Sequence, residues 1–557
     1  MENKYICIHG HFYQPPRENP WLDEIETEDS AYPYPNWNER ITEECYSANA
    51  FCRFVDAPKK SVEIVNNYTK ISFNFGPTLL SWLKRKQPEV YQTILEADQE
   101  SQKRFSGHGA ALAQAYNHII MPLASSWDKR TQVLWGIKDF EHRFKRKPEG
   151  MWLPETAVDL ETLDILSEYG IRFTILAPHQ AAYTKSVSDG EWEEVSGGRI
   201  DPTQPYLCRL PSGRSIALFF YHGPLAHGVA FGGFLRNGEE LAQRFGDTLN
   251  SPTDRDLPRL LHIAVDGETY GHHHRFGDMA LAHCLDSIQT KRRGDLTIYA
   301  EFLERFPPSY EVKIQENTSW SCSHGVERWR ADCGCHTGPH PGWNQKWRVN
   351  LRQAIDWLRN EFSFLYAKEM QPYISDPWRL RDEYIDVILD RSPENLRRFF
   401  QKSFSKALDD KEKARILKLL ELQHHGLLMQ TSCGWFFDDI SGLESVQVMK
   451  YAGRAIQLAR QLTEKDLEPG FLQFLSSAPS NVPEFANGAL IYEKLVKPAI
   501  LDTPRVGAHY AITSLFIDYP KTAHIYSYTV EKDPWTSYEK DGQSVHVGQV
   551  KIRSDIT

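Results

Sequence analysis

The chain has 557 residues, 41% hydrophobic and 25% charged, which is typical of a globular protein with a large core. Its 74 acidic residues outnumber its 64 lysines and arginines, giving a formal charge of −10 without any basic run, which argues against a nucleic-acid partner. No apolar run approaches about 18 residues and no signal-peptide pattern opens the chain, so we expect no membrane partner and a cytoplasmic location. Nine scattered cysteines also fit a reducing compartment.

Short apolar runs alternate with helical patterns through the first half of the chain. One helical segment, LETLDILSEYG, ends at Gly170, as a glycine C-cap predicts. Apolar strands that each lead into a helix indicate a parallel sheet covered on both faces, and this many units predict an open sheet or a barrel. The predicted strands are residues 4–10, 71–76, 104–109, 150–154, 172–178, 215–222 and 260–268.

Polar residues of the kinds used in catalysis recur at the C-terminal ends of these strands. In α/β barrels those ends build the active site, so the recurrence predicts one shared site. The residues are His9, His11, Asn74, His108, Glu155, His179, His222, Asp266 and Glu268.

The pattern changes in the second half. Residues 345–465 carry amphipathic segments with a period of about 3.6, which predict a helical bundle. Residues 508–557 return to alternation, as in AHYAITSLFIDY and QSVHVGQVKIRS, and predict antiparallel strands. The chain stops soon afterwards, before a clear capping element, so we expect this β-rich region to be incomplete.

Two strand ends carry the carboxyl groups that matter most: Glu155 in MWLPETA and Asp266 in AVDGETYG. Hydrolysis of a glycosidic bond needs two such groups, one to protonate the leaving oxygen and one to attack the sugar or activate water. The apolar strand before Asp266 would desolvate it and raise its pKa, which suits a general acid. Each residue also has a structural explanation: Glu155 as an acidic helix start and Asp266 as a loop carboxylate capping GETYG.

Together these motifs resemble glycoside hydrolase family 57, whose members cleave or transfer α-glucans. That family has an HQP-type histidine motif near its N-terminus, seen here as HGHFYQPP, a glutamate after a tryptophan, as in MWLPETA, and a fourth motif that matches DGETYG. The HFYQPP variant looks like a less characterised branch described as amylase- or mannosidase-like. The resemblance covers residues 4–465 and implies an α/β fold, a (β/α)7 barrel followed by helices.

The resemblance also implies domains and roles. We expect a catalytic barrel over 1–320, a cleft loop and helical domain that completes the active site over 321–470, and a β-rich region over 471–557. Glu155 would be the nucleophile and Asp266 the general acid/base of a retaining reaction. The residues expected to hold the sugar at the scissile bond are His9, His11 and Trp152.

The chain departs from the family pattern in two places. Two residues separate His11 from Gln14, where the family has HQP directly. The second motif carries a glutamate in better-known members, whereas its counterpart here, GHGAALAQAYNHIIMPLA, carries His108, Gln114 and His118. These departures leave the inner sugar subsites, and therefore the specificity, open.

A loop-like stretch, residues 320–347, combines cysteines, histidines and aromatic residues. Cys322, Cys333 and Cys335 with His324, His336 and His340 supply enough ligands for zinc, but C-x10-C-x-C is not a usual structural-zinc spacing. We therefore favour a cleft loop in which Trp329 or Trp343 stacks on sugar and Arg328 fixes a carboxylate, with a metal site or simple packing as alternatives.

Two further segments are candidates for sugar contacts. GHHHRFGD carries His272, and because three adjacent histidines cannot all face one ion on a regular element, sugar hydrogen bonding is favoured over metal binding. TSCGWFFDDISG interrupts the helical region with Trp435 and Asp438, which match the family's fifth motif; the alternative is a packed corner with Asp439 as an N-cap.

The sequence therefore predicts a retaining glycoside hydrolase or transglycosylase acting on α-glucan-type oligo- or polysaccharides by double displacement. It predicts no cofactor and no bound metal, and indicates no particular oligomeric state. Two alternatives stay open: a metal-dependent carbohydrate hydrolase, such as a zinc α-mannosidase or a deacetylase, and a non-catalytic glycan-binding protein. The predicted sugar-binding residues are His9, His11, Gln14, His108, Trp152, His222, Glu268, His272, His324, Arg328, Trp329, Trp435 and Asp438.

Overall fold

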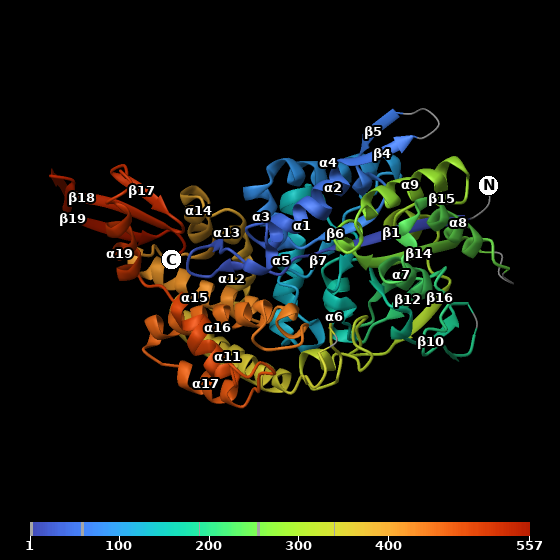
Figure 1. The fold of residues 1–557 in the computed structure, drawn as a ribbon. Coiled ribbons are helices and arrows are strands. Elements are labelled where there is room, and N and C mark those ends of the chain that lie inside the picture. The colour runs from blue at the N-terminus through green and yellow to red at the C-terminus, as the bar shows by residue number, and fades with distance from the viewer. Residues whose placement is uncertain (1–3, 57–60, 189, 253–256, 339) are drawn as a thin grey trace. The chain divides into compact units, whose positions relative to one another are not determined.

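The computed structural model describes residues 4–56, 61–188, 190–252, 257–338 and 340–557. These residues form two compact units (elements labelled in Figure 1). The first unit comprises the residues up to Pro16 together with Thr27–Arg328, and the second comprises Arg17–Glu26 and Trp329–Thr557.

Parallel strands form a barrel in the first unit. Ladder pairing joins β14 to β1, β1 to β6, β7 to β8 and β9 to β13. Single bridges join β6 to Ala111, just before β7, and β9 to Gly150, just before β8. The backbone N–H of His222, just after β13, donates to the carbonyl of His262 on β14 and links the two ends of the series. The barrel strands in the described residues are β1 (Lys4–Phe12), β6 (Ser72–Phe75), β7 (Ala113–Gln114), β8 (Met151–Trp152), β9 (Phe173–Leu176), β13 (Ser215–Phe220) and β14 (Arg259–Asp266).

Helices follow the strands and cover the barrel, as Figure 1 shows. The sequence prediction of apolar strands each leading into a helix is confirmed, and so is Gly170, whose φ of +84° follows the helix end at Glu168. The helices are α3 (Pro77–Lys86), α4 (Pro88–Arg104), α5 (Ser126–Phe144), α6 (Leu160–Glu168), α7 (Gly223–Ala230), α8 (Gly238–Leu249), α9 (Gly277–Thr290) and α10 (Tyr299–Arg305).

The barrel interior is packed with large apolar side chains. Burying each of them contributes about 1.5–3 kcal/mol relative to exposure, so the interior is a stable scaffold for the strand ends. The buried cluster includes Tyr5, Trp152, Phe173, Phe219, Leu260 and Tyr299.

One strand prediction is wrong. Residues 104–109 are the end of helix α4 and a turn in which Gly107 has a φ of +95°. The third barrel strand lies a few residues later, at β7, and is only two residues long. A strand this short has no alternation of its own, so its place depends on the pairing of Gln114 with Trp152 in β8.

A second group of strands extends from β13 on the side of β12 (Pro205–Arg209). β12 pairs with β16 (Tyr310–Ile314), which pairs in turn with β10 (Ala181–Ser186). β16 matters for the site because it leads directly into the loop that begins at Gln315.

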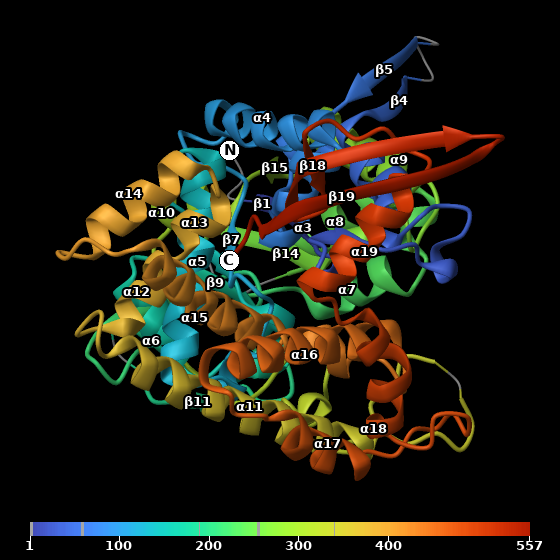
Figure 2. The ribbon, with the colours of Figure 1, turned by 90° about the vertical axis from the view of Figure 1, so that its left-hand side faces the viewer.

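The second unit is mainly helical, as predicted for residues 345–465. Long helices α11 (Trp347–Met370), α15 (Asp410–Leu428) and α16 (Leu443–Thr463) pack against one another (Figure 2). Shorter helices accompany them: α12 (Pro377–Glu383), α13 (Ile385–Leu389), α14 (Pro393–Ser403), α17 (Glu468–Ser476) and α18 (Gly488–Ile491). Among the described residues no helix combines the length and apolar character needed to cross a membrane.

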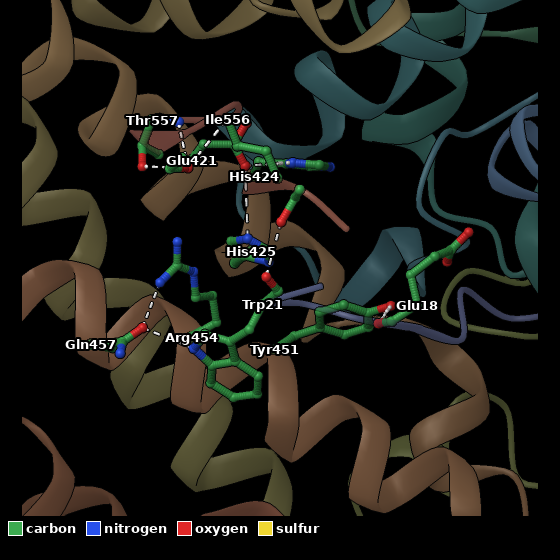
Figure 3. A network of polar contacts seen from close by, with 12 residues as sticks. Glu18, Trp21, Glu421, His424, His425, Tyr451, Arg454, Gln457, Ile556 and Thr557 are labelled. Carbon is green, nitrogen blue, oxygen red and sulfur yellow. Dashed lines mark hydrogen bonds and ion pairs between the residues drawn. The ribbon is translucent and has the colours of Figure 1, made fainter. Parts of the chain in front are cut away.

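A polar network explains why the early segment Arg17–Glu26 belongs to the helical unit (Figure 3). The indole N–H of Trp21 donates to Gln457 on α16 at 2.8 Å, and the Tyr451 hydroxyl donates to the carbonyl of Glu18 at 3.3 Å. Nearby, Glu421 on α15 pairs with His424. The bonds of Trp21 and Glu18 anchor the segment to helix α16.

The end of the chain is only partly β-structured. β17 (Thr522–Ile525), β18 (Tyr528–Lys540) and β19 (Gln543–Ser554) form the predicted antiparallel sheet. The strand predicted over 508–519 is wrong, because residues 503–513 form helix α19. Asp502 caps that helix by accepting from the backbone N–H of Arg505, and proline stands in its first turn.

Candidate active site

Glu155 stands in a strained turn directly after strand β8. Its φ of 57° and ψ of 20° lie in the left-handed region, within the short helical turn Pro154–Thr156. A residue with a side chain costs about 1–2 kcal/mol in this conformation, and such strain persists where the surroundings impose it. Glu155 is not part of the following helix, α6, which begins only at Leu160 and is capped by Asp159.

Two donors from one loop hold the Glu155 carboxyl group. The indole N–H of Trp320 and the hydroxyl of Ser321 both donate to Oε2, at 3.0 and 2.5 Å. The backbone N–H of Trp320 also donates to the carbonyl of Glu155 at 3.0 Å. Burial raises the pKa of Glu155, while the bonds from Ser321 and Trp320 and the charge of Arg328 oppose that rise. These donors favour the ionised form of a buried carboxyl group.

Asp266 ends strand β14 in a different environment. It is the exposed last residue of an otherwise buried strand, and the ladder places it opposite His11 of β1. The surrounding protein raises its pKa well above the ordinary value, and the negative charges of Glu268 and Glu155 raise it further. Gly267 is required next to it, because a Cβ there would lie 2.2 Å from the ring of Phe12.

Glu268 is a third carboxyl group beside these two. Its Oε1 accepts from the Tyr46 hydroxyl at 2.6 Å and from the backbone N–H of Tyr13 at 3.0 Å. Burial raises the pKa of Glu268 to about 7, against the opposing effect of these hydrogen bonds. Glu268 is engaged by protein donors, so its predicted contact with sugar stays a prediction, and its effect on Asp266 is electrostatic.

The histidines of β1 belong to a chain of buried hydrogen bonds. Register places His9 beside Ser72 and His11 beside Asn74 on β6. His9 contacts Ser72 Oγ at 3.0 Å and Asn74 Oδ1 at 3.1 Å, and Asn74 Nδ2 donates to His11 Nδ1 at 2.9 Å. His11 Nε2 then lies 3.2 Å from Nε2 of His118. Burial lowers the pKa of His9 and His118 to about 3, so both rings are neutral near pH 7.

Aromatic rings stack across the same level of the barrel. Trp152 stacks on His9 and His11, with ring centroids 5.0 and 4.9 Å apart, and meets Trp320 edge-on. Neither His9 nor Trp152 has measurable exposed surface. Both therefore support the floor of the site, and their predicted contact with sugar stays a prediction.

The barrel with two carboxyl-bearing strand ends agrees with the sequence comparison. Residues 5–315, more than half of the chain, match the family described as glycosyl hydrolase family 57. The chain belongs to glycoside hydrolase family 57. Residues 343–557 of this family 57 chain match a second family model, described as a domain of unknown function, DUF3536.

Curated relatives of this family 57 chain are distant. An α-amylase from Pyrococcus horikoshii is 21% identical over 262 residues, which are 45% of this chain and 37% of the relative. α-Amylase 1 from Dictyoglomus thermophilum is 26% identical over 106 residues, 19% of this chain and 15% of the relative. The chain thus covers well under half the length of both relatives.

Solved structures resemble the family 57 chain in fold. An exo-type maltose-forming amylase from Pyrococcus sp. ST04 has a TM-score of 0.64 at 15% identity, over 92% of this chain and 94% of that one. A branching enzyme of the family from Pyrococcus horikoshii has a TM-score of 0.54 at 16% identity, over 90% and 99%. At such identities the likeness shows the fold alone.

Two predicted site residues of the family 57 barrel, His108 and His272, are held by carboxylates. His108 precedes β7, on its N-terminal side, and is held between Glu149 at 3.0 Å and Glu304 at 2.5 Å. Burial lowers its pKa, but the two carboxylates prevail and the pKa is raised. His272 is paired with Glu44. Carboxylates of the protein thus engage both histidines, and their predicted contact with sugar stays a prediction.

Other predicted residues do lie near the strand ends. His222 follows β13 and caps helix α7, accepting from the backbone N–H of Leu225 at 3.2 Å. Gln14 follows β1 and donates to the carbonyl of Tyr13 at 3.0 Å. Arg328 is buried and near enough for its charge to lower the pKa of Glu155.

Three predicted residues belong to the helical unit, where protein groups engage them. The Trp329 indole N–H donates to the carbonyl of Ser432 at 3.1 Å. Arg352 covers the Trp435 ring at 4.0 Å. The Asp438 carboxylate accepts from the backbone N–H groups of residues 337 and 338, at 2.8 and 2.9 Å. Their predicted role in sugar binding stays a prediction.

Sequence reasoning missed the groups that hold the carboxylates. Trp320 and Ser321 lie 165 and 166 residues beyond Glu155, in the predicted cleft loop, where the sequence pointed to Arg328, Trp329 and Trp343 instead. Tyr46, which holds Glu268, carried no signal. Asn74 and His118 were noted but were not assigned roles.

Proposed function

We propose that this family 57 chain is a retaining glycoside hydrolase or transglycosylase acting on α-glucan-type oligo- or polysaccharides. The observation that carries the proposal is the contrast between two strand-end carboxyl groups. Two side-chain hydrogen bonds oppose the rise that burial causes in the pKa of Glu155, whereas the surrounding protein and the charges of two neighbouring carboxylates raise the pKa of Asp266 well above its ordinary value. Two carboxyl groups whose pKa values are driven apart in this way can serve as nucleophile and acid at one pH.

In the first step, Glu155 attacks the anomeric carbon and forms a covalent glycosyl-enzyme. Asp266 donates its proton to the leaving glycosidic oxygen as the bond to the anomeric carbon breaks. The leaving sugar departs as an alcohol, and Asp266 is left ionised.

In the second step, Asp266 takes a proton from an incoming water or sugar hydroxyl, whose oxygen attacks the anomeric carbon. The bond to Glu155 breaks, and both carboxyl groups return to their starting states. Water as acceptor gives hydrolysis, and a glucan hydroxyl gives transfer. Two inversions retain the anomeric configuration.

The scaffold residues position this pair. Trp320 and Ser321 fix the carboxyl group of Glu155, and the strained turn at Glu155 aims it. Neutral His9 and His11, tied to Asn74, form a rigid polar floor beside Asp266. A preorganised site of this kind lowers the cost of aligning the sugar with its nucleophile.

Trapping the intermediate tests the proposal. The protein is incubated with 5-fluoro-α-D-glucosyl fluoride, digested and mapped by mass spectrometry. The proposal predicts one label, on Glu155, and none in Glu155→Gln. A label on another carboxyl group would refute the assignment, and parallel assays with β-linked glucans would refute the α-glucan class if those substrates reacted faster.

The metal-dependent alternative gains no support from the strand ends. The described His, Cys, Asp and Glu residues contain one group of three or more able to share an ion, and it lies in the loop of residues 322–335. The barrel histidines instead contact Ser72, Asn74 and one another. The strand ends thus offer carboxyl groups, and the loop offers the metal ligands.

A further inference from the structure

The loop after β16 brings four metal-binding side chains together. One ligand atom from each of Cys322, His324, Cys333 and Cys335 lies within 4.8 Å of all the others. The four come from one continuous stretch, so their convergence is a property of that loop. All nine cysteines are in the described residues, and no disulfide joins any of them.

The separations of the four ligand atoms are small enough for one zinc ion to bind them all. In a tetrahedral site, ligand atoms about 2.3 Å from zinc lie about 3.8 Å from one another. The ligand atoms here lie within 4.8 Å of one another, so each separation needs to shorten by at most about 1 Å on binding. Three cysteines and one histidine are also a ligand set typical of structural zinc, and soft thiolates favour zinc over magnesium or calcium. The ligand spacing in the sequence is unusual, but Gly325 and Gly334 allow the loop to turn between the ligands, with φ values of +85° and +77°.

A buried cation adjoins the cluster. Arg348 has no exposed surface, and its Nη1 lies 4.0 Å from Cys333 Sγ and donates to the carbonyl of Cys335 at 2.9 Å. Three thiolates with one Zn²⁺ carry a net charge of −1, which a guanidinium can balance. This independent feature fits a cluster that is anionic when occupied.

We propose that Cys322, His324, Cys333 and Cys335 bind one zinc ion as a structural site. Binding displaces the three thiol protons to solvent and uses the neutral imidazole of His324. All four positions are filled by protein, so the ion has no open position for substrate. Its effect is to fix the loop.

Fixing the loop has a consequence for the barrel, which rests on the proposed function. Cys322 directly follows Trp320 and Ser321, the two donors to Glu155. Zinc at Cys322 would restrain these donors and preserve their bonds to the nucleophile. The metal would thus support the site without touching substrate.

Metal content and spectroscopy test the site independently of activity. Full-length protein is dialysed against a weak chelator, and its zinc is measured by mass spectrometry. Cobalt is then exchanged into the site. We expect one zinc per chain, and for cobalt the intense visible bands of tetrahedral geometry with a thiolate-to-cobalt charge-transfer band. Absence of retained zinc together with an octahedral cobalt spectrum would overturn the proposal.

Variants identify the ligands. Cys333→Ser with Cys335→Ser should lose the metal, His324→Cys should keep it with four thiolates, and the matched control Cys433→Ser should keep one zinc per chain. Equal loss of zinc from the control and the double variant would overturn the assignment. The cobalt spectrum of the unaltered protein decides the matter even where a variant fails to fold.

Activity separates the two proposals. Zinc removal should move the acidic limb of the pH–rate profile to higher pH, as loss of the Ser321 hydrogen bond to Glu155 would. Circular dichroism of the zinc-free protein should show that the barrel is still folded. If one zinc binds but its removal leaves the profile unchanged, the positioning role is refuted while the site stands. If zinc binds and no α-glucan is turned over, the proposed function fails and the zinc site stands.

Discussion

The hydrogen bond from Ser321 to Glu155 offers a sharp perturbation, Ser321→Ala. The change removes a hydroxyl that donates to Oε2 at 2.5 Å and leaves the Trp320 bond in place. Hydrogen bonds to charged groups contribute about 1.5–3 kcal/mol, and one pKa unit corresponds to about 1.36 kcal/mol, so the pKa of Glu155 should rise by about one to two units.

The sign of the effect on activity follows from the proposed role of Glu155 as nucleophile. A nucleophile works ionised, so activity is lost as pH falls through its pKa. A higher pKa of Glu155 moves the acidic limb of the kcat/KM profile to higher pH by the same amount, about one to two pH units. The alkaline limb, set by protonated Asp266, should stay in place.

The assay is kcat/KM on a soluble α-glucan across the pH range. Ser212→Ala is a matched control, because Ser212 donates to Asp164 at the same 2.5 Å on the exposed surface. An unshifted acidic limb in folded Ser321→Ala protein, or an equal shift in the control, would show that this bond does not tune the nucleophile.

Three further predictions follow from the barrel. Glu268→Gln removes a negative charge that raises the pKa of Asp266, so the alkaline limb should move to lower pH; an unchanged limb contradicts the coupling. Glu155→Gly should be more stable to unfolding than Glu155→Ala by about 1 kcal/mol, and so melt at a higher temperature, because only glycine adopts a φ of 57° without strain. Equal melting temperatures of the two variants would argue against strain at this position. Asn74→Ala should lower the free energy of unfolding in urea by about 1–3 kcal/mol, because it strands buried histidine nitrogens, whereas exposed Asn250→Ala should change it little.

Local patterns sufficed for most of the barrel. An apolar strand followed by an amphipathic helix can be recognised within about 30 residues, which is why the strands other than β7 were predicted. β7 failed because its two residues take their place from pairing with β8. Residues 508–519 failed for another reason: apolar alternation outweighed the start signals of a helix, Asp502 and Pro504.

The proposed catalytic pair could be named from the sequence, but the groups that hold it could not. Glu155 and Asp266 stand in motifs, so sequence alone identifies them as candidates. Ser321 and Trp320 act on Glu155 only because the loop after β16 folds back onto the strand end. His108 shows the converse error: a strand-end histidine by pattern, it is bound by Glu149 and Glu304 before its strand begins.

The central claim is that Glu155 attacks the sugar and Asp266 transfers the proton. Azide rescue tests both roles in one measurement, using Glu155→Ala and Asp266→Ala with an activated α-glycosyl substrate and nuclear magnetic resonance of the product. Azide that replaces the nucleophile attacks from the opposite face, so Glu155→Ala should yield the β-glycosyl azide. Asp266→Ala should yield the α-glycosyl azide, because azide then attacks the glycosyl-enzyme. The same anomer from both variants, or exchanged anomers, would contradict the account.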